Sequence, residues 1–377
     1  MKKPLLYLFA LLLFACGGKD GEDTTDFANL KVSLDTVIVD PGEDIINLKY
    51  GIWRSALTSD NRFMYLWDED AKSMSVINLD ELVLDKKVKF NNDGPDGVGD
   101  YIMWIQALDN GHLMMADFER YNVFDLQAKK LQEFRLKKEE FGGDSLKEGQ
   151  NLHRKPVVVN NGQQVYGTLQ DWADQSIVLA KVDFENKLVK KYELPGQEKL
   201  ADYSIMMTTG QMTMVTGSDK NITKVGNKVI LSSSAYTDLY VLDMDKDSVY
   251  QVSYTPKLTK ASKKGGYPKE VDSEKEFRAL MRQVQEEINF TSPVWDSEKK
   301  RFYRLSYITS FPEHLENEDV KGEQKVFLTV LDENFKVLGE TVVEGIKHFP
   351  GNPFVKDGKI WVYLNVDDEL GFVRISL

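Results

Sequence analysis

The sequence predicts an all-β protein, a six-bladed β-propeller with one inserted helix near residues 273–289. Three observations predict this fold. Runs of β-branched and aromatic residues alternate with turns of Asn, Asp and Gly, one strand-and-turn pattern recurs, and a strand with no sheet of its own precedes the first repeat. Short apolar runs between such turns are typical of antiparallel β-structure. Apolar residues make up 42% and aromatic residues 11% of the 377 residues, which fits a folded, β-rich protein.

The recurring pattern is an apolar strand that ends at Asp or Asn, followed by a polar turn and another strand. Its copies reach this position at Asn78, Asp125, Asp183, Asp243 and Asp332, and a degenerate copy is Phe372-Val373-Arg374-Ile375. A turn and a second apolar strand lie upstream of most copies. The copies are about 40 to 60 residues apart, with one gap of about 90, and four-stranded units at this spacing are typical of propeller blades.

The two ends of the chain complement each other. The last unit stops at Leu377, soon after its third strand, and lacks an outer strand. We expect the segment from Leu30 to Val39 to pair beside that third strand, which would close the ring and hide a sheet edge. Alternation along the segment predicts that Leu30, Val32 and Leu34 are buried on one face.

The longest gap between repeats contains the predicted helix, which Ser273 can cap. Apolar residues recur at helical spacing at Phe277, Leu280, Met281, Val284 and Ile288. We expect this helix to cover a face or flank of the propeller, and a docking helix for a partner is the alternative.

The first residues resemble a bacterial lipoprotein signal. Lys2 and Lys3 precede an apolar run, and Leu13-Phe14-Ala15-Cys16 is similar to a lipobox, where the peptide is cut before a lipid-modified cysteine. The run is shorter than the roughly 20 residues of a membrane-spanning helix. A secretory signal cut elsewhere is the alternative. We therefore expect a lipoprotein signal peptide at 1–15, a flexible acidic tether at 16–26 and the β-propeller at 27–377.

The expected location is the outer membrane, where the lipid anchors a protein that faces the cell exterior. Lys19 followed by acidic residues resembles sorting tracts of surface lipoproteins, and a periplasm-facing protein is the alternative. Cys16 is the only cysteine, so the fold depends on its core and not on disulfides. The net charge of −12 disfavours nucleic acid as a partner and leaves membrane attachment to the lipid.

The segment Asp93-Gly94-Pro95-Asp96-Gly97-Val98-Gly99 is similar to a Gly-Pro-rich turn between blades of certain six-bladed proteins. Together with the lipobox and the repeat across residues 27–377, it resembles a domain-of-unknown-function family of bacterial outer-membrane lipoproteins. That family's propeller is related to TolB-like and NHL-like ones. Asp96 departs from the usual glycine after proline. The resemblance implies a propeller fold and assigns no catalytic residues.

The sequence contains no linear motif for catalysis or cofactor binding, and we expect no cofactor and no metal site. Its four histidines form no metal-ligand pair, and nucleophile-elbow, phosphate-loop and dinucleotide motifs are absent. Asp243, Asp245 and Asp247 imitate the start of an EF-hand loop without its glycine and final acid, so we expect a hairpin turn there.

Five residues are candidates for a ligand site: Trp53, Arg54, Trp104, His153 and Arg154. Exposed tryptophans would form a sugar-binding platform, and packing between blades is the alternative for both of them. We expect a non-catalytic module that binds a glycan, peptide or protein partner. The alternative is a hydrolase or lyase with its site in the central channel. An exposed aromatic patch would favour binding, and a convergent cluster of Asp, Glu, His and Arg would favour catalysis.

Overall fold

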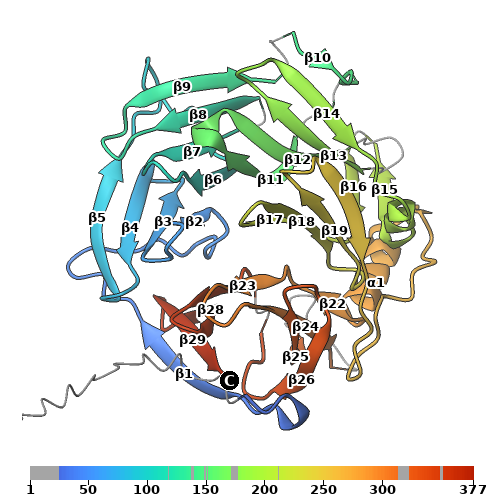
Figure 1. The fold of residues 1–377 in the computed structure, drawn as a ribbon. Helices are drawn as coiled ribbons and strands as arrows, with labels where there is room; N and C mark the ends of the chain where they lie inside the picture. Colours follow the sequence, from blue (N-terminus) through green and yellow to red (C-terminus); the bar gives the residue numbers. More distant parts are fainter. Residues whose placement is uncertain are drawn as a thin grey trace, which may run out of the picture.

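The structure is a computed structural model that describes residues 25–377 apart from 118, 137–139, 148–149, 151, 171–176, 211, 313–321 and 349–350. Cys16, the signal segment and most of the tether lie outside the described residues. The described strands form seven sheets, and six of these sheets lie around a ring (Figure 1). The all-β class is confirmed. No helix of the described part is long and apolar enough to cross a bilayer.

Three sheets form the first half of the ring. The first contains β2 (Ser55–Leu57), β3 (Phe63–Asp68), β4 (Ser73–Asn78) and β5 (Val83–Lys89). The second contains β6 (Trp104–Ala107), β7 (Leu113–Ala116), β8 (Arg120–Phe124) and β9 (Lys130–Arg135). The third contains β11 (Leu152–Val159), β12 (Gln164–Gln170), β13 (Ile177–Asp183), β14 (Leu188–Tyr192) and the short parallel strand β10 (Gly142–Gly143).

Three further sheets follow around the ring. The fourth contains β17 (Lys220–Val225), β18 (Lys228–Ser233), β19 (Leu239–Asp243) and β20 (Ser248–Val252). The fifth contains β22 (Asn289–Phe290), β23 (Val294–Asp296), β24 (Arg301–Ser310), β25 (Glu323–Asp332) and β26 (Val337–Val343). The sixth contains β27 (Phe354–Lys356), β28 (Lys359–Val366), β29 (Glu369–Ser376) and β1 (Ser33–Ile38). Short 3-10 helices are η1 (Phe27–Asn29), η2 (Asn160–Gly162) and η3 (Gln197–Tyr203).

The recurring sequence pattern coincides with one position in these sheets. Each copy lies at the end of the third strand of its sheet, β4, β8, β13, β19 and β25, and the degenerate copy lies in β29. In several copies the Asp or Asn side chain accepts hydrogen bonds from backbone N–H groups of the following turn, as Asp183 does from Asn186 at 2.9 Å. The pattern recurs because each hairpin needs this turn residue.

The hydrophobic core is divided among the interfaces between neighbouring sheets. Six clusters of buried side chains each join two adjacent sheets of the ring. The cluster between the first sheet and the sixth contains Met64 and Ile77 on one side and Trp361 and Phe372 on the other. Each of these six sheets therefore buries apolar side chains on both of its faces.

Strand β1 pairs antiparallel with β29, from Ser33 opposite Ser376 to Ile38 opposite Gly371. Its side chains depart from the predicted alternation, because Leu30 is buried and Val32 partly buried, whereas Leu34 is 36% exposed. The fully buried residue of this segment is Val39, just after the strand. The prediction for Leu34 is wrong because β1 is an outer strand of its sheet. The buried side chains of this segment are Leu30, before the strand, and Val39, where the chain turns toward the first sheet.

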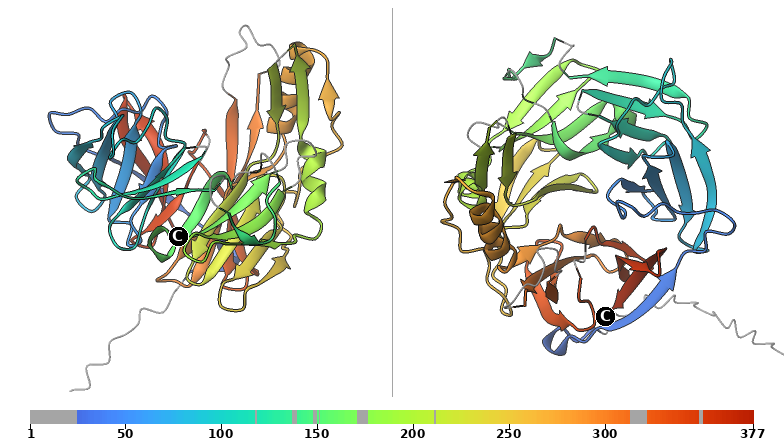
Figure 2. Two further views of the ribbon diagram at one scale, coloured as in Figure 1. Left: turned by 90° about the horizontal axis from the view of Figure 1, so that it is seen from above. Right: turned by 180° about the vertical axis from the view of Figure 1, so that it is seen from behind.

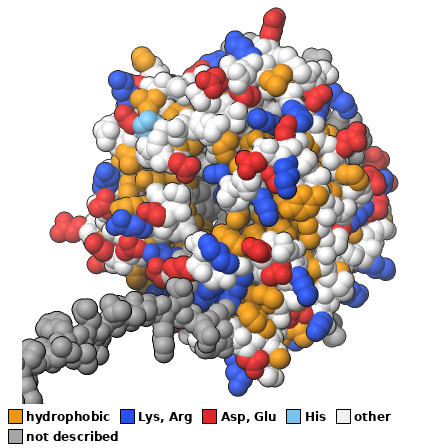
Figure 3. All heavy atoms as spheres, viewed as in Figure 1, with side chains coloured by type: hydrophobic (Ala, Val, Ile, Leu, Met, Phe, Trp, Pro, Cys, Tyr) orange, Lys and Arg blue, Asp and Glu red, His pale blue; other side chains and the backbone are white. Residues whose placement is uncertain are grey.

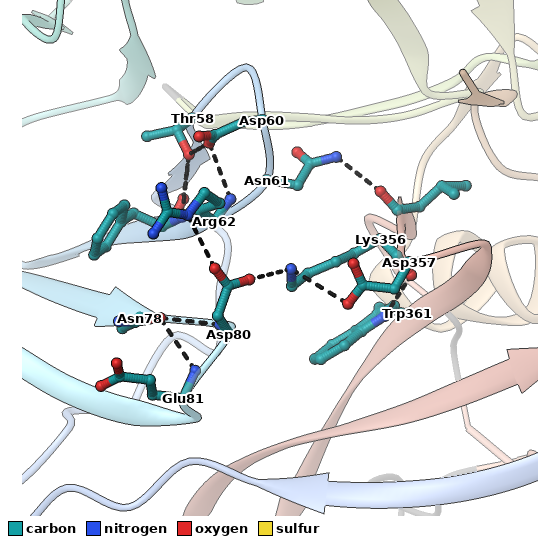
Figure 4. A network of polar contacts seen from close by, with 12 residues as sticks. Thr58, Asp60, Asn61, Arg62, Asn78, Asp80, Glu81, Lys356, Asp357 and Trp361 are labelled. Carbon is teal, nitrogen blue, oxygen red and sulfur yellow. Dashed lines mark hydrogen bonds and ion pairs between the residues drawn. The ribbon is translucent and has the colours of Figure 1, made fainter. Parts of the chain in front are cut away.

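A polar network also joins the first sheet to the sixth (Figure 4). Asp80 accepts a hydrogen bond from Arg62 at 2.9 Å and pairs with Lys356, which is only 6% exposed. Asn61 donates to the backbone oxygen of Val355 at 2.7 Å, and the Trp361 indole donates to that of Lys356 at 3.1 Å. Burial opposes the charge of Lys356, but its contacts with Asp80 and Asp357 raise its pKa.

The seventh sheet stands out from the ring in the side view (Figure 2). It contains β15 (Ile205–Thr209), β16 (Met212–Thr216) and β21 (Glu270–Val271), and helix α1 (Glu274–Gln285) packs against it. The helix is confirmed, with the Ser273 side chain accepting from the Glu276 amide at 3.3 Å. Sequence analysis missed the β15–β16 hairpin, and the helix covers this sheet through Phe277 and Val284.

Candidate functional site

A cavity of about 890 Å³ lies at the centre of the ring. Every sheet of the ring contributes residues to its lining, including Ala56 of β2, Trp104 of β6, Lys155 of β11, Asn221 of β17, Phe290 of β22 and Phe354 of β27. On the face of Figure 1, hydrophobic side chains gather beside a central hollow (Figure 3). A cavity of this size holds a ligand of several rings, so we refer to it as the central cavity and treat it as the candidate site.

Aromatic side chains mark the rim of the central cavity. Trp53 and Tyr101 line the cavity and are nevertheless 46% and 37% exposed, and neighbouring Tyr50 is 53% exposed. Gly51 lies between Tyr50 and Trp53 in the chain with a φ of +56°, and a Cβ atom there would come within 3.3 Å of the Tyr363 ring. This glycine therefore allows the turn that brings both rings close to Arg54.

Arg54 lies beneath these rings. Its guanidinium carbon is 4.8 Å from the Trp53 ring centre, 4.5 Å from that of Tyr101 and 5.5 Å from that of Tyr50. The residue is only 5% exposed and is not part of the cavity lining. Cation–π contacts of this kind hold the three exposed rings against one buried guanidinium group.

Glu69 balances the charge of Arg54. One carboxylate oxygen lies 3.4 Å from the guanidinium and also accepts from the Trp67 indole at 2.8 Å and from the Ile102 amide at 3.3 Å. Lys72 pairs with the other oxygen. A buried charge needs such a partner, so Arg54 is held in place by Glu69 and is not free to meet a ligand directly.

The remaining candidates from the sequence lie in different surroundings. Trp104 is 1% exposed and packs 6.0 Å from Tyr121, so it contributes to the inter-sheet core as well as to the cavity lining. His153 and Arg154 lie in β11, and their side chains are outside the described part of the structure. The structure therefore brings Trp53 and Arg54 together at the rim and places Trp104 deeper.

Lys155 is a cavity residue that sequence analysis did not select. The pairing of β11 with β12 is interrupted between His153 and Val157, where Pro156 has no N–H to donate. Bulges of this kind re-aim side chains. Lys155 lies in this bulge, lines the cavity, and burial lowers the pKa of its ammonium to about 8. The available signal was a lysine followed by proline next to the candidate residues His153 and Arg154.

The acidic triplet after β19 forms a hairpin turn, as predicted. The Asp243 carboxylate accepts from the amides of Asp245 and Lys246, and Asp247 pairs with Lys190 on a different sheet. In the described residues there is no group of three His, Cys, Asp or Glu side chains that could hold a metal ion. Asp219 is the one carboxylate among the described residues that line the central cavity.

One family model matches most of the chain, residues 28–342, and its description is a domain of unknown function, DUF4221. The chain belongs to this family. The resemblance to a family of unknown function is thereby confirmed. No curated protein matches this DUF4221 chain by sequence.

Solved structures similar to this chain include a member of the same family. A DUF4221 family member from Bacteroides vulgatus has a TM-score of 0.65 at 15% identity, covering 92% of this chain and 98% of its own. A protein of Bacteroides fragilis described as exported has a TM-score of 0.50 at 8% identity, covering 94% and 97%. The β-propeller domain of Swd1 from Myceliophteria thermophila has a TM-score of 0.40 at 10% identity, covering 90% and 99%.

Proposed function

We propose that this DUF4221 protein is a six-bladed β-propeller closed by its N-terminal strand, with the domain spanning residues 27–377. The pairing of β1 with β29 supports this reading. So does the cluster that joins β3 and β4 to β28 and β29, because only a continuous ring needs a core between its first and last sheets.

The propeller is anchored to the outer membrane through lipid on Cys16, after removal of residues 1–15, and residues 16–26 act as the tether. The lipobox and the acidic tract after it support this assignment. The exported description of the Bacteroides fragilis neighbour agrees with a position outside the cytoplasm. Cys16→Ser should abolish the uptake of labelled fatty acid, and equal labelling of variant and parent would contradict the anchor.

The function of the domain is to bind a glycan, without catalysis, at the rim and interior of the central cavity. The observation that carries this proposal is the set of exposed rings of Tyr50, Trp53 and Tyr101 fixed over Arg54. Aromatic faces stack on the apolar faces of sugar rings, and a platform that is already rigid loses little entropy on binding.

Binding of the full chain to a panel of neutral and acidic oligosaccharides tests this function. Trp53→Ala should weaken the affinity of any bound oligosaccharide by about tenfold or more. Tyr250→Ala is the matched control, because Tyr250 is a 43% exposed aromatic residue on the outer strand β20. Equal losses in both variants, or a parent protein that binds no oligosaccharide, would contradict the proposal.

A further inference from the structure

The central cavity has two chemically different walls. The apolar wall comes from the first, second and sixth sheets and includes Ile52, Leu57, Met64, Met103 and Phe354. The opposite wall comes from β17 and the segment around β22 and β23. It combines the polar residues Asn221, Thr223, Thr291 and Ser292 with the apolar residues Ile222, Phe290 and Val294. Strands β2 and β17, one from each wall, face each other across the ring (Figure 1). A ligand that fills the cavity therefore meets one apolar wall and one wall of mixed polarity.

One cation in the cavity has unmet bonding capacity. Lys155 is partly buried, and none of the described residues forms an ion pair or hydrogen bond with its ammonium. Burial lowers the pKa of Lys155 to about 8, and no carboxylate of the described residues opposes this shift. A cation in an apolar surrounding without a counter-charge is a place where an anion binds favourably.

The other titratable groups around Lys155 do not supply that counter-charge. Strand β6 beside it carries none, and β17 contributes Lys220, another cation. The cavity also contains Asp219, Tyr101 and Tyr307, each of which already has an interaction partner. The described lining therefore holds two lysines against one carboxylate, although the whole protein carries a net charge of −12.

We propose that the central cavity binds an anionic ligand with an apolar face, such as an acidic sugar, and that Lys155 provides the counter-charge. This inference rests on the proposed function and specifies its ligand class. The apolar wall receives the ring face, the Asn221 amide and the Ser292 hydroxyl receive polar groups, and the ammonium receives the carboxylate or sulfonate. Protonated Lys155 is the binding form, so the affinity falls when the ammonium loses its proton.

Two fluorescent probes that differ mainly by one charge test the inference on the full chain. 8-Anilinonaphthalene-1-sulfonate carries a sulfonate at every pH used, and N-phenyl-1-naphthylamine has the same aromatic body and no charge. We expect the sulfonate to bind about tenfold more tightly than the neutral probe at pH 7, and Lys155→Met to remove that preference. Lys86→Met is the matched control, because Lys86 is exposed on the outer strand β5.

The pH dependence separates a counter-charge from a packing effect. For the parent protein, the affinity for the sulfonate should be constant below about pH 7 and fall between pH 7 and 10 as Lys155 loses its proton, whereas neutral-probe binding stays constant. Lys155→Arg should retain sulfonate binding and lose the pH dependence, because guanidinium stays protonated throughout. These two measurements need no Lys155→Met protein, so they decide the question even if that variant does not fold.

The outcomes distinguish the inference from the function beneath it. Parent-like sulfonate affinity in Lys155→Met, or an affinity that is constant from pH 7 to 10, overturns the role of Lys155. Equal binding of both probes overturns the anionic ligand class while leaving the cavity as a binding site. If neither probe binds, the anionic ligand with an apolar face is overturned, and the oligosaccharide panel decides the proposed binding function separately.

Discussion

Replacing Val39 by alanine should weaken the whole ring and not only the first strand. Val39 is fully buried, and its amide donates to the Leu370 backbone at 2.8 Å. It belongs to the cluster that joins the first sheet to the sixth. Each buried methyl group stabilises by about 0.8 kcal/mol, so the two lost groups account for about 1.6 kcal/mol. The cavity left behind adds to this, for a total of about 2 to 3 kcal/mol.

Ile38→Ala is the matched control for this variant. Ile38 is the adjacent residue, but it is 46% exposed on the outer side of β1. The substitution removes more carbon than Val39→Ala does, yet we expect it to cost at most about 1 kcal/mol, mostly through lower strand propensity. Carbon count alone would rank the two variants in the opposite order.

Urea unfolding and amide hydrogen exchange measure the effect. If the ring is continuous, Val39→Ala lowers the free energy of unfolding and reduces amide protection in β3, β4 and β29 together. If β1 is only a peripheral strand, amide exchange increases in residues 33–38 alone and the urea midpoint does not change. That second result, or a larger loss in Ile38→Ala, would refute the reasoning about closure.

Further variants test individual polar contacts. Arg304 is 1% exposed and donates to four backbone oxygens across the fourth and fifth sheets. Arg304→Lys should therefore lower the free energy of unfolding in urea by about 3 kcal/mol or more, and a near-neutral effect would contradict the role of Arg304 in joining the two sheets. Hydrogen bonds from Arg374 lower the pKa of Asp35 to about 2. These bonds add less than about 1 kcal/mol to the free energy of unfolding above pH 4, and this contribution is lost as the pH falls toward 2. Asp35→Asn should remove that part of the acid dependence, and an unchanged profile would contradict it. Lys263→Met should lower the free energy of unfolding by about 2 kcal/mol, whereas Lys155→Met should leave it unchanged or raise it. A larger loss of thermal stability in Lys155→Met than in Lys263→Met would contradict the roles given to these lysines.

The sequence predicts local features of this fold better than distant ones. The hairpin turns and helix α1 depend on neighbouring residues, such as the Asp243 carboxylate and the Ser273 cap, and both features are visible in short windows. The β15–β16 hairpin was missed because its Met and Thr residues give weak alternation, although Gly210 with a φ of +60° marks its turn. Which side chains of β1 face inward depends on where the first sheet lies, and no short stretch of sequence around β1 contains that information.

The candidate site likewise contains some residues that the sequence could indicate and others that only the folded structure reveals. Trp53 could be selected because a tryptophan near an inner strand is uncommon enough to notice, and it does lie at the cavity rim. Arg54 was selected as a charge that is difficult to bury, but Glu69 and three rings bury it. That arrangement joins the loop before β2 to the end of β3 and to the segment before β6, so it exists only in the folded ring. Lys155 was missed because its position follows from a register shift that only the sheet reveals.

The two lysines with a lowered pKa show how a structural group differs from a candidate ligand group. Burial lowers the pKa of both Lys155 and Lys263 to about 8, so the titration alone does not separate them. Lys263 donates to the backbone oxygen of Val284 at 2.8 Å and to Asn289 at 2.7 Å, and thereby satisfies a carbonyl at the end of helix α1. Its desolvation is offset within the protein. Lys155 has no such acceptor among the described residues and borders an 890 Å³ cavity, which is the reason for proposing that a bound anion offsets its desolvation.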